Sequence, residues 1–121
     1  METMSKHFSD SEFKKCVPSC SIGDMNANTL ARLDTARDLA GIPFVLNSAY
    51  RSPAHDRSKG RSGTGAHTLG RAVDIRCNTD GNRFRIIQAL MKAGFRRIGI
   101  AKTYIHADDS PNHTQNITWL Y

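Results

Sequence analysis

A short strand with one apolar and one polar face sets the strongest limit on how this chain can fold. In residues 71–77, RAVDIRC, side chains alternate, so that Val73 and Ile75 share one face while Asp74 and Arg76 share the other. A strand of this kind belongs to a sheet that packs one face on a core and keeps the other face polar. The pattern predicts such a sheet and raises the question of what the Asp74 carboxylate binds.

Three segments are predicted to be helical. Residues 26–41 and 80–94 repeat apolar side chains at helical spacing and end at Gly41 and Gly94, which are typical helix-ending residues. The residues predicted to face the core are Leu30, Leu33, Ala36 and Ala40 in the first segment and Phe84, Ile87, Leu90 and Met91 in the second. Residues 9–16 begin with capping side chains, which indicates a shorter helix.

The remaining apolar segments are short enough to be strands. They comprise residues 43–50, 96–101, 103–108 and 117–121. Residues 51–65 are rich in serine, glycine and charge, which predicts a loop. Helices combined with several non-parallel strands indicate an α+β fold. We therefore expect a small single domain over residues 1–121, in which helices flank an antiparallel sheet.

The chain is basic, with 17 lysines and arginines against 11 aspartates and glutamates among its 121 residues and a formal net charge of +6. This balance favours an anionic partner, which can be nucleic acid, an acidic membrane or an anionic cell-wall polymer. No segment interleaves basic and aromatic residues as nucleic-acid recognition motifs do. We therefore expect no nucleic-acid partner.

Membrane and redox signals are weak in this sequence. No apolar run approaches the roughly 18 residues that a membrane-spanning helix needs, so we expect no membrane partner. Residues 1–15 lack the apolar core of a signal peptide, which predicts a chain made in the cytoplasm. Cys16, Cys20 and Cys77 are odd in number and lack a second Cys pair, which favours reduced thiols over a disulfide or a structural metal.

Two histidines and the strand aspartate are candidates for a metal site. His67 precedes the strand that holds Asp74, and His106 lies on the predicted strand 103–108 with Tyr104 and Asp108 on the same face. Two imidazoles and a carboxylate form a donor set that suits zinc, which in hydrolases takes three protein ligands. The residues alone leave an alternative open, in which Asp74 pairs with an arginine such as Arg51 or Arg71.

Three segments of the chain, taken in order, resemble a known enzyme family. SAYRS (48–52), GAHTLGRAVDI (65–75) and IGIAKTYIHAD (98–108) are similar to the signature blocks of the zinc D-Ala-D-Ala carboxypeptidase family. That family also contains phage L-alanyl-D-glutamate endolysins and murein DD-endopeptidases, and it shares its fold with the amino-terminal domain of hedgehog proteins. The similarity extends over about residues 28–121.

The resemblance implies a role for several residues of this chain. His67, Asp74 and His106 correspond to the zinc ligands, and Arg51 corresponds to an arginine that binds a substrate carboxylate or polarises its carbonyl. A planar guanidinium suits both tasks. Ser48, in the same block as Arg51, is expected to hydrogen-bond near the substrate.

The general base is the point at which the sequence departs from the family pattern. Many members carry an acid three residues before the last histidine, where this chain has Thr103. Asp108 is the best available base, and its alternative role is to orient His106 through the ring N–H. Tyr104 is expected to stabilise the oxyanion or simply to pack. Gly65 replaces a serine that is common two residues before the first ligand.

We therefore expect a monomeric zinc peptidase that hydrolyses an amide bond in peptidoglycan stem or cross-bridge peptides. Because the chain lacks an export signal, a phage or prophage endolysin that acts on the cell wall after release fits the sequence best. The alternative is a non-catalytic binding domain that zinc stabilises on the same scaffold, and Thr103 keeps this alternative open. The sequence does not distinguish carboxypeptidase from endopeptidase activity.

Overall fold

The computed structural model describes residues 4–121 of the chain. The helices are α1 (Asp10–Lys14), α2 (Ala27–Ala40), α3 (Pro53–Ser58) and α4 (Asp80–Ala93), with 3₁₀ turns η1 (Ile22–Asp24) and η2 (Ala66–Leu69). The strands are β1 (Leu46–Ser48), β2 (Ala72–Arg76), β3 (Arg97–Ile100), β4 (Tyr104–Asp108) and β5 (Ile117–Leu120). This composition confirms the predicted α+β class.

The five strands form one sheet in the order β1-β2-β4-β3-β5. Neighbours are antiparallel except β3 and β5, which run parallel, so the prediction of a purely antiparallel sheet is wrong at one edge. The reason lies in the connection after β4. Because β4 ends where β3 begins, a strand that returns along the free edge of β3 must run in the direction of β3.

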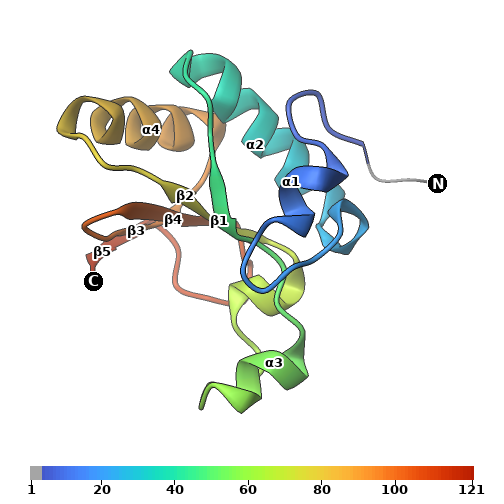
Figure 1. Ribbon diagram of the computed structural model, residues 1–121. Helices are drawn as coiled ribbons and strands as arrows, with labels where there is room; N and C mark the ends of the chain where they lie inside the picture. The colour runs from blue at the N-terminus through green and yellow to red at the C-terminus, as the bar shows by residue number, and fades with distance from the viewer. Residues whose placement is uncertain (1–3) are drawn as a thin grey trace.

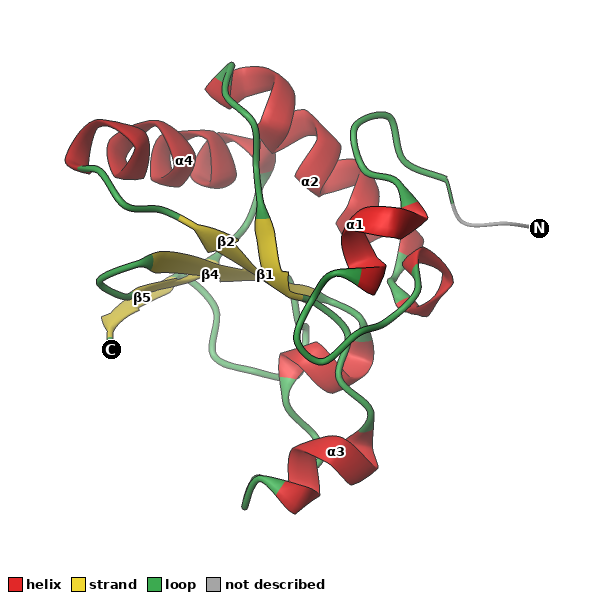
Figure 2. Cartoon of the chain, viewed as in Figure 1, coloured by secondary structure: helices red, strands yellow, loops and turns green. Residues whose placement is uncertain are grey.

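Helices α2 and α4 cover one face of the sheet, and the chain segment with α3 extends away from the opposite side (Figure 1; Figure 2). The core lies between the two long helices and the apolar face of the sheet. It includes the fully buried residues Leu30, Leu33, Val73, Ile75, Leu90, Ile98 and Ile105. The alternation predicted for residues 71–77 is therefore confirmed, because its apolar positions face the helices.

The inward face of α2 is confirmed, whereas that of α4 is only partly as predicted. Leu90 of α4 is buried, but Phe84 and Met91 are 66% and 50% exposed. Ile86 and Ala89 take the inward positions instead. The buried face of α4 is therefore rotated about the helix axis relative to the predicted face. Helical spacing alone does not determine which of several apolar residues contact the sheet.

The predicted loop at residues 51–65 contains helix α3, so this prediction is wrong for Pro53–Ser58. The Ser52 side chain accepts a hydrogen bond from the His55 backbone, and Pro53 occupies the first turn. Serine followed by proline is a helix-start signal that the charge and glycine content of the segment obscured.

The polar face of the sheet is left free of the long helices. On this face, Asp74 of β2 lies directly opposite His106 of β4, and Arg76 lies opposite Tyr104. The three cysteines are free and buried, as expected for reduced thiols. Within residues 4–121, no helix combines the length and apolar character needed to cross a bilayer.

Candidate metal centre

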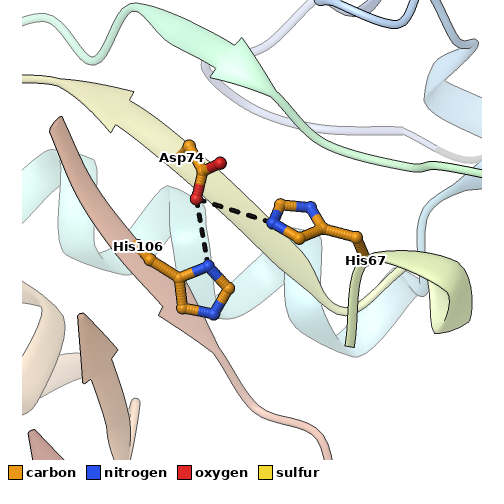
Figure 3. Close-up of side chains that lie close together, drawn as sticks. All are labelled: His67, Asp74 and His106. Atoms are coloured by element: carbon orange, nitrogen blue, oxygen red, sulfur yellow. Dashed lines mark hydrogen bonds and ion pairs between the residues drawn. The ribbon is translucent and has the colours of Figure 1, made fainter. Parts of the chain in front are cut away.

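His67, Asp74 and His106 converge on the polar face of the sheet (Figure 3). Asp74 and His106 meet because β2 and β4 pair directly at these positions, and His67 reaches them from η2, the turn that precedes β2. Asp74 Oδ1 lies 3.5 Å from His67 Nε2 and 3.0 Å from His106 Nδ1. One ligand atom from each residue lies within 4.8 Å of the other two.

This arrangement fits a zinc ion. Zinc–ligand bonds of about 2.0–2.1 Å in a tetrahedral site place neighbouring donors about 3.3 Å apart. The two distances to Asp74 Oδ1, 3.0 and 3.5 Å, lie on either side of this value. Two nitrogens and one oxygen also match the donor types of catalytic zinc, which takes three protein ligands and keeps one further position open.

Hydrogen bonds on the far side of each imidazole orient both rings toward the shared point. His67 Nδ1 lies 2.6 Å from the carbonyl oxygen of Ala49, and His106 Nε2 lies 2.6 Å from Asp108 Oδ2. Each of these nitrogens therefore carries a proton and donates it, so that in the neutral form of each ring the lone pair lies on His67 Nε2 and on His106 Nδ1. These are the two nitrogens that face Asp74.

Ser48 contacts Asp74, one of the predicted ligands of the metal centre. It is 6% exposed, and its hydroxyl donates a 2.7 Å hydrogen bond to Asp74 Oδ2. The bond directs the other oxygen, Oδ1, toward the two histidines. The structure thus places Ser48 next to a predicted ligand, where it orients that ligand.

Asp108 is fully buried behind His106. Besides the contact with His106, its carboxylate accepts hydrogen bonds from Arg97 Nε at 2.8 Å and from the Ser110 backbone at 3.2 Å. Asp109 points elsewhere, as the alternation of the strand predicts, and binds Thr29 on α2. These contacts favour the positioning role of Asp108, which the sequence left as the alternative to a general base.

The shared contacts shift the pKa values of the three groups. Burial alone would raise the pKa of Asp74, but hydrogen bonds from His106 and His67 hold it far below its ordinary value. Burial would lower the pKa of His106, whereas Asp108 and Asp74 raise it above its ordinary value. The pKa of Asp108 is lowered, because contacts with His106 and Arg97 outweigh burial. Metal binding therefore competes with protonation of His106.

A cavity of about 310 Å³ opens in front of the three predicted ligands. Arg51 and Tyr104 line it, which places both predicted site residues beside the metal centre. The Arg51 side chain is 14% exposed, and its guanidinium lies 3.5 Å from the buried carboxylate of Asp56. Asp108 does not line this cavity. The arrangement presents a cation and a phenol to any molecule that reaches the metal.

Residues near the C-terminus complete the centre, and sequence reasoning missed them. The Trp119 ring lies 5.4 Å from the His106 ring, and Tyr121, which lines the cavity, lies 5.3 Å from Tyr104. Gly99 makes room for them, since a Cβ there would lie 2.7 Å from both added rings. Alternation in residues 117–121 places Trp119 and Tyr121 on one face, but only the parallel pairing with β3 brings that face to His106.

The other three histidines lie apart from the centre, and one of them, His7, contacts Asp38 near the N-terminus. His55 is a half-buried residue of α3, and His113 contacts the Ser110 hydroxyl at 2.7 Å. Among the described residues, His67, Asp74 and His106 form the cluster of histidine, cysteine or acidic side chains that is close enough to hold a metal. The ligand set inferred from the resemblance therefore coincides with the geometric cluster.

The fold and this cluster define a class of protein, the metal-dependent hydrolases, in which two histidines and a carboxylate hold the ion at the edge of an accessible cavity. The chain matches the family model described as Peptidase M15 over residues 6–108 and belongs to this family of zinc-dependent peptidases. The match confirms the resemblance to the zinc D-Ala-D-Ala carboxypeptidase family and makes the chain a metallopeptidase. A search of curated proteins finds no match. Strand β5 lies beyond the matched residues.

Proposed function

We propose that this metallopeptidase uses zinc to hydrolyse an amide bond in the stem or cross-bridge peptides of bacterial peptidoglycan. The observation that carries the proposal is the convergence of His67, Asp74 and His106 beside a cavity that also contains Arg51. The similarity of the signature blocks to those of murein peptidases supports the choice of substrate. The net charge of +6 supports it further, because it favours approach to an anionic wall.

Each side chain around the cavity has a separate task. His67, Asp74 and His106 hold the ion, which when bound supplies a Lewis acid that polarises the peptide carbonyl and activates water. Arg51, fixed by Asp56, binds a substrate carboxylate or compensates negative charge on the carbonyl oxygen. Tyr104 offers a phenolic O–H to the same cavity.

We assign Asp108 the task of positioning His106 rather than that of general base. Its carboxylate is fully buried, and both of its oxygens already accept hydrogen bonds from protein groups. A base must come within hydrogen-bonding reach of the water whose proton it takes, and Asp108 does not line the cavity. Its contact with His106 instead fixes the ring and its tautomer.

The site of action follows from the substrate. We propose that the chain is made in the cytoplasm, is released by lysis as a phage or prophage endolysin, and then degrades the wall as a monomer. The similarity of its signature blocks to those of a family that includes phage endolysins supports this route. The positive charge is spread over the chain and suits contact with a polymer rather than with a single small anion.

Digestion of purified sacculi tests the proposal. The zinc-loaded protein should release soluble muropeptides, and mass spectrometry of these products names the bond that is cut. His67→Ala should abolish release and zinc binding, whereas His55→Ala, which changes a histidine outside the cluster, should retain both. A wild-type protein that binds zinc without releasing any product would contradict the proposal and favour the non-catalytic zinc domain.

A further inference from the structure

A second, larger cavity adjoins the metal centre on the side of β1. It has a volume of about 630 Å³ and shares Arg51, Asp74 and Tyr104 with the cavity described above. The two cavities therefore meet at the predicted ligand Asp74. A peptide that spans the centre has one part in each cavity, so the second cavity is in place to receive the segment on one side of the scissile bond.

The second cavity carries an excess of positive charge. Lys15 and Arg76 line it, and neither forms an ion pair within residues 4–121. The carboxylate that lines it is Asp74, whose charge a bound zinc ion would offset. By contrast, the first cavity contains Asp56 close to its arginines. A concave surface that is lined by cations attracts anionic ligands.

The wall of this cavity also exposes apolar side chains beside an edge strand. Val17 is 79% exposed and Val45 is 50% exposed, and both line the cavity. β1 is the outermost strand of the sheet, and the Val17 N–H covers part of its edge with a 2.9 Å hydrogen bond to the Asn47 carbonyl. Small apolar groups of a bound peptide thus find side-chain contacts here.

We propose that this β1-side cavity binds an acidic peptide segment of the substrate, with a carboxylate held by Lys15 and Arg76 and small apolar groups against Val17 and Val45. The inference rests on the proposed function and deepens it, because it adds a requirement for negative charge away from the scissile bond. Lys15 follows α1 directly, and Arg76 ends β2, so both cations are carried by elements that the fold fixes. The substrate is therefore recognised by Lys15 and Arg76 on one side of the metal and by Arg51 beside the metal.

Binding measurements test the proposal without requiring turnover. The zinc-loaded, ¹⁵N-labelled protein is titrated with blocked tripeptides Ala-Glu-Ala and Ala-Gln-Ala, each in L and D form, at low and high salt. We expect Glu peptides of at least one hand to shift the amide signals of residues 15–17, 45–48 and 76. Each lost charge contact should weaken binding about two- to fivefold, as expected for accessible ion pairs, and salt should reduce the preference.

Variants provide the controls for this experiment. The preference for Glu over Gln should fall in Lys15→Gln and in Arg76→Gln and vanish in the double variant. Lys92→Gln removes an exposed cation on α4, which covers the other face of the sheet, and should leave the preference unchanged. Equal binding of Glu and Gln peptides, no saturable shift, or a preference that survives the double variant would overturn the proposal.

Two further outcomes distinguish the peptide site from a nucleic-acid site and from the proposed peptidase activity. A single-stranded oligonucleotide that saturates the same amides and displaces the Glu peptide would assign the cavity to nucleic acid and overturn the peptide proposal. Preserved charge-dependent peptide binding in a protein that releases nothing from sacculi would refute the proposed activity alone, while the cavity assignment would stand.

Discussion

Replacing Asp108 with asparagine tests how the metal centre is held together. The carboxylate accepts hydrogen bonds from His106, Arg97 and the Ser110 backbone, so it faces donors on every side. An asparagine has one oxygen and one NH₂ group. If its oxygen faces His106, the NH₂ opposes the donors of Arg97 and Ser110; if it turns around, it favours the His106 tautomer that carries a proton on Nδ1, the nitrogen needed for zinc.

Both orientations of the new amide in Asp108→Asn weaken the same property, the affinity for zinc. Loss of a carboxylate behind a metal-binding histidine typically costs 10- to 100-fold in metal affinity, or about 1.4–2.7 kcal/mol. Competition with a chromogenic chelator measures this change directly. The single tryptophan, Trp119, lies 5.4 Å from the His106 ring, so quenching of its fluorescence by Co²⁺ gives an independent readout.

Asp109→Asn is the matched control for this variant. Asp109 is also buried, with a side chain that is 4% exposed, and it binds Thr29 and Arg32 of α2. Its loss should lower stability by an amount similar to that in Asp108→Asn, about 1–3 kcal/mol for unpaired buried donors, but leave zinc affinity unchanged. Wild-type zinc affinity in Asp108→Asn, combined with a loss of hydrolysis, would refute the positioning role and restore Asp108 as general base.

Three further predictions concern neighbouring residues. Ser48→Ala removes the 2.7 Å hydrogen bond to Asp74 and should weaken zinc binding about fivefold in the chelator assay, since a buried hydrogen bond contributes about 1 kcal/mol; unchanged affinity would contradict the orienting role. Gly99→Ala places a Cβ against Trp119 and should cost about 1–3 kcal/mol and red-shift tryptophan emission, whereas an unaltered spectrum and melting temperature would show that β5 lies elsewhere. In metal-free protein, His106 faces Asp74 and Asp108 and has a pKa above 6.5, so its stabilising effect is complete below that pH and is lost as pH rises through the raised value. The melting temperature of metal-free protein should therefore fall as the pH rises from about 6.5 through the raised pKa of His106, and a rise over this range would contradict the shift.

The parts of the fold that the sequence predicts are those governed by local pattern. Alternation identified β2 and the face of Asp74, and helical spacing with terminal glycine located α2 and α4 within a few residues. The parallel pairing of β5 with β3 was out of reach, because strand direction depends on where the preceding loop crosses the sheet. The exposure of Phe84 shows a similar limit, since the helix pattern does not specify its rotation against the sheet.

The predictable part of the site is the set of ligands, and the unpredictable part is their surroundings. His67, Asp74 and His106 lie in sequence blocks whose residue types and offsets suggest a shared ion. Their hydrogen-bond partners include the backbone carbonyl of Ala49. A contact of this kind cannot be predicted from the residue type, because every residue has a backbone carbonyl. Arg97 likewise reaches Asp108 only because β3 pairs with β4 at that register.

The hydrogen-bond partners explain why an open sheet face can carry a metal site at all. Side chains on such a face are free to rotate unless something fixes them, and each predicted ligand is fixed by a different residue: Ala49 after β1 for His67, Ser48 in β1 for Asp74, and Asp108 in β4 for His106. Because β1, β2 and β4 are adjacent strands of one sheet, these three supports share a rigid frame. The remaining side of the centre is left to the two cavities, so the same sheet that fixes the ligands leaves the metal position accessible to a peptide.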